Sequence, residues 1–207
     1  PFLSYQSSTE KAVQNAGILV QDGGAEGVKL EGGVPVLEQV KAIAKAGIPV
    51  MGHVGYNPQY QVRDAYVYNA NRGTIPKIQG KGPKGARSLL DIGQQLQDAG
   101  AFALVIELVT VEAASLMAEK LTIPIIGIGS GGGCDGQVLV FNDLVGLSNF
   151  ELSLLTPYAK TRKKWLDAIS LYRRDVESQH FPTDKHCIHM EPDKIASLEK
   201  TLKDEGK

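Results

Sequence analysis

The sequence predicts an α/β fold with a parallel sheet, on three observations. Residues 101–107 form an unbroken apolar run after the helix-ending Gly100, which is typical of a strand buried on both faces. Amphipathic segments precede and follow this run, so it is the strand of a βα unit. Comparable strands begin near Ala25, Ile48 and Ile123 and alternate with helical patterns, as a parallel sheet requires.

The remaining elements follow from local spacing and end signals. Apolar residues at helical spacing predict helices over residues 8–20, 35–46, 85–100, 111–121 and 160–176, with a weaker helix near 195–202. Strands are expected over 25–31, 48–55, 101–107 and 123–129, with a strand-to-loop piece over 139–147 and a short fifth strand at 158–159. Ser8-Thr9-Glu10 is a helix-start pattern, and Gly47 is a helix-end signal.

Composition excludes several classes of function. The 207 residues carry a formal net charge of −1, which provides no attraction for nucleic acid or an anionic membrane surface. No apolar run approaches the roughly 18 residues of a membrane span, and the first residues lack a signal-peptide pattern. The two cysteines, Cys134 and Cys187, form no disulfide framework, which fits a reducing compartment. We therefore expect a cytoplasmic protein.

Repeated βα units are compatible with an open doubly wound sheet or with a closed (β/α)8 barrel. Two similar strand starts, Gly-Ile-Pro-Val and Thr-Ile-Pro-Ile-Ile, favour a barrel, as do polar residues at the strand ends. Four or five strands cannot close an eight-stranded barrel, which usually takes about 250 residues. The sequence therefore predicts either part of a barrel or an open sheet.

The strand ends supply the candidate functional residues. Lys29 and Glu31 are two residues apart, so both point to the same side of a strand, where they would form either a substrate and metal site or an internal ion pair. His53 lies between glycines and could contact an anion or a metal, although a lone histidine is more often structural. Glu107 ends its strand, where it would be either a general base or a solvated carboxylate. In closed barrels, this end of the strands holds the chemistry.

Three other patterns are less specific. The long polar segment 56–84 could attract an anionic ligand through Arg63, Arg72, Lys77, Lys81 and Lys84, but a solvated loop is favoured. Residues 127–131 contain G-x-G-x-G, yet no helical pattern opens directly after them, so a dinucleotide site is not expected. His186, Cys187 and His189 lack a second ligand pair, so zinc is not favoured there.

Six segments, in order, resemble the ketopantoate hydroxymethyltransferase family. They are Val28-Lys29-Leu30-Glu31-Gly32-Gly33, Gly-Ile-Pro-Val-Met-Gly-His-Val-Gly over 47–55, Asn57-Pro58-Gln59, Ala-Gly-Ala-Phe-Ala-Leu-Val-Ile-Glu over 99–107, Ile-Pro-Ile-Ile-Gly-Ile-Gly over 123–129 and Asp-Gly-Gln-Val-Leu-Val over 135–140. Residues 1–5 and Phe181-Pro182 with His186 are also similar to family segments. We therefore expect residues 1–189 to form one catalytic domain and residues 190–207 a charged tail.

The resemblance implies a (β/α)8 TIM barrel of the phosphoenolpyruvate/pyruvate type, here without its first strands. It implies transfer of a hydroxymethyl group from methylene-tetrahydrofolate to 3-methyl-2-oxobutanoate in pantothenate biosynthesis, with Mg²⁺ bound at the strand ends. Matched position by position, Glu107 is the proton acceptor, Lys29 and His53 bind substrate, and Glu31 belongs to the metal shell. A homo-oligomer, commonly a decamer, is also implied. Trp165, Leu166 and Tyr172 would suit that contact or the coat of the barrel, and the coat is favoured.

The sequence also departs from the family pattern. The two metal-ligand Asp residues of the family would precede Pro1, so we expect little or no activity from the isolated chain. Tyr56 and Asn57 stand in place of the usual Leu-Thr, and the segment 56–84 is longer than expected. Two alternatives stay open: a lyase-type member of the same barrel superfamily, and a non-catalytic barrel fragment.

Overall fold

The structure is a computed structural model that describes residues 2–60, 77–149 and 156–205. The chain divides into two compact units, Pro1–Val140 and Phe141–Lys207. The predicted boundary between a domain over 1–189 and a tail over 190–207 therefore stays a prediction. In the described part of the chain, every helix is too short or too polar to cross a lipid bilayer.

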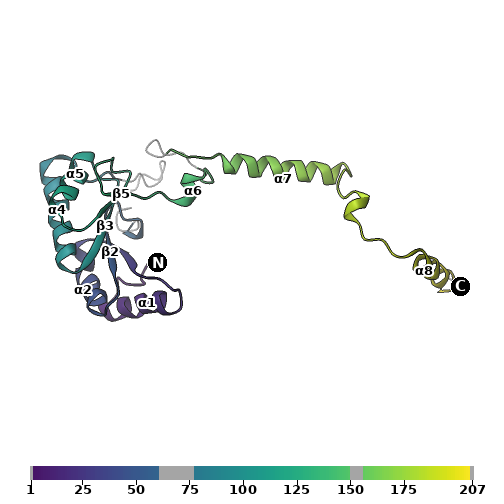
Figure 1. Ribbon diagram of the computed structural model, residues 1–207, viewed down its shortest axis with the longest axis horizontal. Helices are drawn as coiled ribbons and strands as arrows, with labels where there is room; N and C mark the ends of the chain where they lie inside the picture. The colour runs from purple at the N-terminus through teal and green to yellow at the C-terminus, as the bar shows by residue number, and fades with distance from the viewer. Residues whose placement is uncertain (1, 61–76, 150–155, 206–207) are drawn as a thin grey trace. The chain divides into compact units, whose positions relative to one another are not determined.

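The first unit alternates strands and helices (Figure 1). Its strands are β1 (Val28–Glu31), β2 (Val50–Gly55), β3 (Ala101–Glu107), β4 (Ile125–Ile128) and β5 (Gly136–Gln137). Its helices are α1 (Thr9–Gln21), α2 (Leu37–Lys45), α4 (Gly82–Asp98) and α5 (Val111–Lys120), with 3₁₀ turns η1 (Val34–Val36) and η2 (Pro58–Tyr60). Ser8 caps α1 as expected, because its Oγ accepts a hydrogen bond from the backbone N–H of Lys11 at 3.1 Å.

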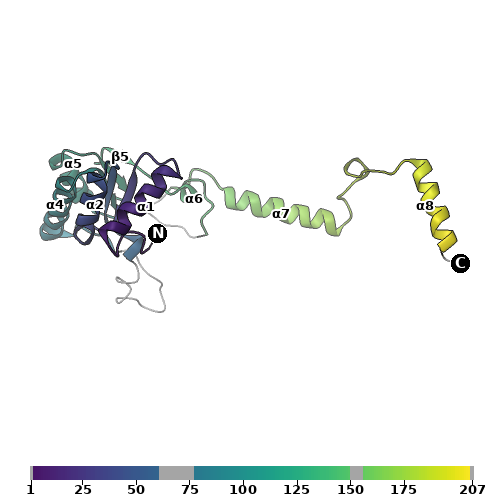
Figure 2. The same cartoon turned by 90° about the horizontal axis from the view of Figure 1, so that it is seen from below.

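All five strands are parallel, and their order in the sheet follows the chain, β1-β2-β3-β4-β5. Right-handed crossovers between neighbouring strands place the connecting helices on one face when the order never reverses. Helices α1, α2 and α4 accordingly lie side by side, and α5 follows α4 (Figures 1 and 2). A doubly wound sheet would reverse its order at a switch point, and these five strands contain no reversal.

The hydrophobic core fills the space between the sheet and this helical layer. Alternate strand residues face the helices, and Leu104 of β3 belongs to this set because it packs close to Leu96 and Met117 of the helices. The set also includes Val28, Leu30, Val50, Val54, Ile106 and Ile125, all buried. The opposite face of the sheet carries Lys29, Glu31, His53 and Glu107. The pleat thus separates packing residues from the candidate functional residues.

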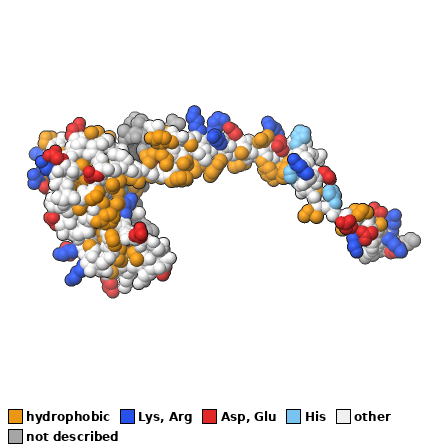
Figure 3. Space-filling view, in the orientation of Figure 1, with side chains coloured by type: hydrophobic (Ala, Val, Ile, Leu, Met, Phe, Trp, Pro, Cys, Tyr) orange, Lys and Arg blue, Asp and Glu red, His pale blue; other side chains and the backbone are white. Residues whose placement is uncertain are grey.

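The second unit is helical. It contains α6 (Phe141–Leu144), α7 (Thr161–Glu177), the 3₁₀ turn η4 (Asp184–His186) and α8 (Pro192–Glu205). An apolar stripe runs along α7 at helical spacing (Figure 3), formed by the exposed side chains Trp165, Leu166, Ile169 and Tyr172. The expectation that this stripe coats a barrel stays a prediction.

Three local expectations were wrong. Residues 141–144 form a helical turn because polar Asn142 and Asp143 interrupt the alternation that a strand needs. Tyr158 and Ala159 lie outside any strand, and the fifth strand is instead β5, which pairs with β4 directly after the glycine-rich turn. Phe102 is exposed rather than buried, because the register of β2 and β3 shifts opposite it.

Much of the long polar segment, including Arg63 and Arg72, falls outside the described residues. In the described end of this segment, α4 begins at Gly82, three residues earlier than expected. Gln79 forms an isolated parallel bridge with Val109 and thereby extends the sheet contact beyond the end of β3.

Candidate active site

Three of the four predicted residues meet at the carboxyl ends of neighbouring strands. Glu31 ends β1 and stands opposite His53 of β2 in the sheet register. Glu107 ends β3 and stands opposite Gly55, two residues beyond His53. Because residues two apart on a strand point to the same face, the side chains of His53 and Glu107 share the face opposite the helices.

His53 lies between the two carboxylates. Its Nε2 is 3.3 Å from Oε2 of Glu107, and its Nδ1 is 3.8 Å from Oε1 of Glu31. The ring is only 1% exposed, whereas the Glu31 and Glu107 side chains are 12% and 21% exposed. Neither ring nitrogen forms a well-aligned hydrogen bond. A buried imidazole with both nitrogens facing carboxylates is an arrangement suited to acid–base chemistry.

The position of Glu31 is constrained by two segments distant in the chain. The backbone N–H of Gln59, in η2, donates to Oε2 of Glu31 at 2.8 Å. The hydroxyl of Tyr5 donates to the backbone carbonyl of Glu31 at 3.1 Å and accepts from its backbone N–H at 3.3 Å. The tyrosine hydroxyl thus satisfies the backbone groups of Glu31 on the side of β1 away from β2.

Burial raises the pKa of the Tyr5 hydroxyl above its ordinary value, and the charges of Glu31 and Tyr60 add to the increase. The hydrogen bond with the Glu31 backbone opposes part of this effect. Tyr5 therefore remains a neutral hydrogen-bonding group beside Glu31. This role could not be predicted from the sequence, because a tyrosine near the start of the chain carries no recognisable site pattern.

Glu107 is positioned through its backbone by Gly55. A Cβ added to Gly55 would lie 2.2 Å from the carbonyl oxygen of Glu107, and Gly55 has φ +92°. Only glycine combines this conformation with so close an approach. The N–H of Tyr56 donates to the same carbonyl at 2.8 Å. Leu108, the next residue after Glu107, has φ +52°, an uncommon conformation for a residue with a side chain.

Ser130 ties the turn after β4 to the end of β3. Its buried hydroxyl donates to the carbonyl of Ile106 at 2.9 Å and accepts from the N–H of Val109 at 3.1 Å. The Ser130 side chain thus holds the backbone carbonyl before Glu107 and the backbone N–H after Leu108. Ser130 therefore gives this turn a structural role that the G-x-G-x-G pattern did not predict.

Lys29 is not brought into contact with the other three candidates. It lies two residues before Glu31, about 6.6 Å along the strand, and its side chain is exposed. Within the described residues it forms no ion pair with Glu31, His53 or Glu107. Its predicted contact with substrate stays a prediction.

The described residues do not by themselves form a magnesium site. Mg²⁺ requires a near-octahedral oxygen shell, usually of one or two carboxylates with water and substrate oxygens. Glu31 is the proposed ligand, but no group of three or more His, Cys, Asp or Glu side chains in the described ranges is arranged to hold a metal ion. In the tail, Nδ1 of His186 accepts from the N–H of Thr183 at 3.1 Å, and Nε2 of His189 pairs with Asp184 at 2.9 Å.

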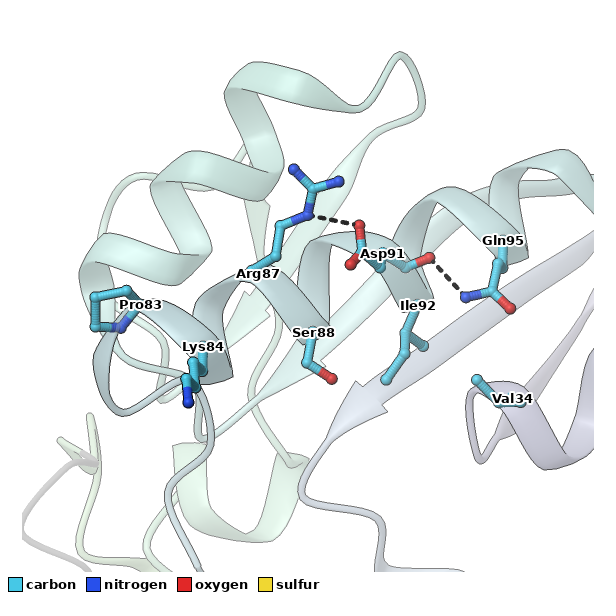
Figure 4. Close-up of a pocket in the computed structure, with 8 residues that line it drawn as sticks. All are labelled: Val34, Pro83, Lys84, Arg87, Ser88, Asp91, Ile92 and Gln95. Atoms are coloured by element: carbon cyan, nitrogen blue, oxygen red, sulfur yellow. Dashed lines mark hydrogen bonds and ion pairs between the residues drawn. The ribbon is translucent and has the colours of Figure 1, made fainter.

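A hollow of about 580 Å³ lies elsewhere, between the outer face of α4 and Val34 of η1 (Figure 4). Its lining includes Arg87, which contacts Asp91 at 2.8 Å along the helix, and Gln95, which donates to the Asp91 carbonyl at 3.1 Å. None of the four predicted site residues lines this hollow.

Fold and site together define a class: a parallel α/β protein with acid–base side chains at the carboxyl ends of adjacent strands. Residues 1–184 match the family model described as ketopantoate hydroxymethyltransferase. The chain belongs to this family, and its members are transferases.

Two relatives named 3-methyl-2-oxobutanoate hydroxymethyltransferase illustrate the match. The protein from Clostridium botulinum (strain Alaska E43 / Type E3) is 42% identical over 199 residues, covering 96% of this chain and 69% of the relative. The one from Carboxydothermus hydrogenoformans is 45% identical over 194 residues, covering 93% and 67%. Among solved structures, a putative phosphonomutase from Burkholderia cenocepacia J2315 is 12% identical with a TM-score of 0.42, covering 85% of this chain and 66% of that one. A TM-score of this size supports no conclusion about fold or function.

Proposed function

We propose that this chain transfers a hydroxymethyl group to 3-methyl-2-oxobutanoate, giving 2-dehydropantoate, with methylene-tetrahydrofolate as the donor. The membership in the family and the names of the relatives support this reaction. The observation that carries the proposal is the 3.3 Å approach of Glu107 to the buried His53, next to Glu31. No described residue favours the lyase alternative or a non-catalytic fragment.

Glu107 is the proposed base. Its carboxylate takes the proton from carbon 3 of the substrate, and the electron pair of that C–H bond moves into an enolate. Carbon 3 then bonds to the methylene carbon of the donor as one of the two C–N bonds of that carbon breaks. Water displaces the second nitrogen and supplies the oxygen of the new hydroxymethyl group, and tetrahydrofolate leaves with the proton taken by Glu107 and one proton of the water on its two nitrogens. Glu107 is partly exposed on one side and next to His53 on the other, so it has both access to substrate and a fixed neighbour.

Lys29 and His53 are the proposed substrate-site residues. The ammonium of Lys29 is an exposed positive charge on the face of the sheet that carries Glu31, and it would balance the carboxylate or the developing enolate oxygen. His53 borders the position where carbon 3 must lie if Glu107 is to reach its proton.

Mg²⁺ is the proposed cofactor, with Glu31 in its shell. When bound, such a cation would polarise the 2-oxo group of the substrate. Glu31 alone does not complete an octahedral shell, so the steps above use only the side chains of this chain. We further propose a barrel of eight strands as the parent architecture, for which the unreversed strand order is a supporting feature.

A homo-oligomer, as large as a decamer, and a cytoplasmic location complete the proposal. The exposed apolar stripe on α7 is a surface suited to association. Light scattering coupled to size exclusion tests the oligomer, and a monomer at micromolar concentration would contradict it.

Transfer of a carbon-13 label tests the reaction itself. The chain and the 42% identical Clostridium relative are incubated in parallel with Mg²⁺, 3-methyl-2-oxobutanoate and ¹³C-methylene-tetrahydrofolate. We expect label in the hydroxymethyl carbon of the product in both, at least about 100-fold more slowly for this chain, because the metal contribution of several kcal/mol is incomplete. No label above a protein-free control would contradict the function, and an equal rate would contradict the account of the metal.

A further inference from the structure

We propose that His53 acts on Glu107 as a positioning residue, through Nε2, rather than by binding substrate directly; this inference rests on the proposed function. Two carboxylates face the ring, but at different distances, 3.3 Å on the Nε2 side and 3.8 Å on the Nδ1 side. The shorter distance is close to that of an N–H···O hydrogen bond, and the longer one is well outside it.

The asymmetry of the two distances indicates which nitrogen carries the hydrogen. Each imidazole nitrogen either carries an N–H donor or presents a lone pair. The donor attracts a carboxylate and the lone pair repels one, so the closer carboxylate lies on the donor side. This assigns an N–H to Nε2, directed at Oε2 of Glu107.

Burial leaves His53 few other partners. The ring is 1% exposed, and neither nitrogen has an aligned hydrogen bond in the described structure. An unsatisfied buried donor is costly, so the contact with Glu107 gains most by becoming aligned. Catalytic hydrogen bonds are often long or poorly aligned without substrate and shorten when it binds. Once aligned, this bond holds one oxygen of Glu107 and leaves the other for carbon 3.

The backbone contacts around Glu107 also support a positioning role for His53. The carbonyl of Glu107 is held by the N–H of Tyr56, and Gly55 permits the two strand ends to approach. The main chain of the base is therefore fixed, while its side chain is held only by His53 among the contacts that the structure describes. Loss of the Nε2 donor would leave the carboxylate free to rotate.

Two variants of His53 distinguish the contribution of Nε2 from that of Nδ1. In His53→Gln the side-chain amide nitrogen lies near the former Nε2, and in His53→Asn it lies near the former Nδ1. The rate of deuterium exchange at carbon 3 of 3-methyl-2-oxobutanoate and its dissociation constant are measured for both variants. The exposed-site variant His180→Gln serves as the control.

We expect His53→Asn to lower the exchange rate about 10- to 100-fold, with His53→Gln restoring much of it. We expect the dissociation constant to change less than about twofold in both. Equal loss in the two variants, or a dissociation constant that rises in step with the rate loss, would overturn the proposal. A rise in the dissociation constant would assign His53 to substrate binding.

Nitrogen-15 NMR of the wild-type ring tests the inference without any variant and without turnover. The expected spectrum has a protonated Nε2 for His53. An unprotonated Nε2 would overturn it. Because this measurement needs no catalysis, it distinguishes failure of the inference from failure of the proposed function, which would appear as unchanged exchange in Glu107→Gln.

Discussion

Oε2 of Glu107 lies 3.3 Å from Nε2 of His53, although the two residues stand on different strands and are two positions apart in register. This contact depends on three local features: the glycine at position 55, the shared face of alternate strand residues, and the buried serine that holds the chain around Glu107.

Substitution of Lys29 tests whether this residue binds the oxo acid. In Lys29→Met, the side chain keeps its length and loses its charge. We expect the KM for 3-methyl-2-oxobutanoate to rise about 10-fold or more, because charge-assisted bonds contribute about 1.5–3 kcal/mol. Lys41→Met, at an exposed position on α2, is the matched control. An unchanged KM in Lys29→Met would remove this residue from the substrate site.

Gly55 tests the approach of the strand ends. Gly55→Ala places a methyl group against the Glu107 carbonyl, whereas Gly47→Ala, at a similar φ of +85°, places it in open space. We expect Gly47→Ala to cost about 1–2 kcal/mol from backbone strain alone. Gly55→Ala is expected to cost more than about 3 kcal/mol because overlap is added to that strain. Urea unfolding followed by circular dichroism measures both, and equal losses would contradict the close approach.

Tyr5 tests the anchoring of Glu31. Tyr5→Phe removes two hydrogen bonds to the Glu31 backbone, and we expect a loss of about 1–2 kcal/mol at neutral pH. The pKa of Tyr5 is raised in the folded state, so its contribution is complete below the unfolded-state value of about 10 and falls as pH rises beyond it. The difference between wild type and variant should therefore shrink at alkaline pH. Tyr158→Phe, at a largely exposed site, should show no such trend.

The reactivity of the Cys134 thiol tests its burial in the turn after β4. Burial raises the pKa of this thiol, and the neighbouring Asp135 raises it further, so less reactive thiolate is present at neutral pH. Cys187 is exposed. With iodoacetamide at pH 7, we expect mass spectrometry to find Cys187 modified at least about tenfold faster, with Cys134 gaining reactivity as pH rises. Equal rates at pH 7 would contradict the burial of Cys134.

The sequence predicted the main elements because their patterns are local. The apolar run bounded by Gly100 and Glu107 set β3 correctly, apart from Phe102, whose exposure depends on a register shift with β2. The two residues of β5 are too few for a recognisable pattern, and their pairing with β4 is a tertiary property. Local spacing likewise could not supply this pairing.

For the candidate site, alternation on strands predicted which side chains share a face. It could not predict that His53 contacts both carboxylates while Lys29 contacts neither, because those distances depend on strand register and side-chain conformation. The roles of Tyr5 and Ser130 also arise from contacts between segments more than 20 residues apart, 26 for Tyr5 with Glu31 and 24 for Ser130 with Ile106. Such contacts leave no periodic signal in the sequence.

The most direct test of the central claim is proton NMR of 3-methyl-2-oxobutanoate in deuterium oxide with Mg²⁺. This exchange at carbon 3 needs the base but not the folate donor. We predict that wild type accelerates the exchange, that Glu107→Gln lowers the acceleration about 10²- to 10⁴-fold, and that Glu112→Gln, on the exposed face of α5, leaves it unchanged. Exchange in Glu107→Gln at the wild-type rate would contradict the assignment of Glu107 as the base.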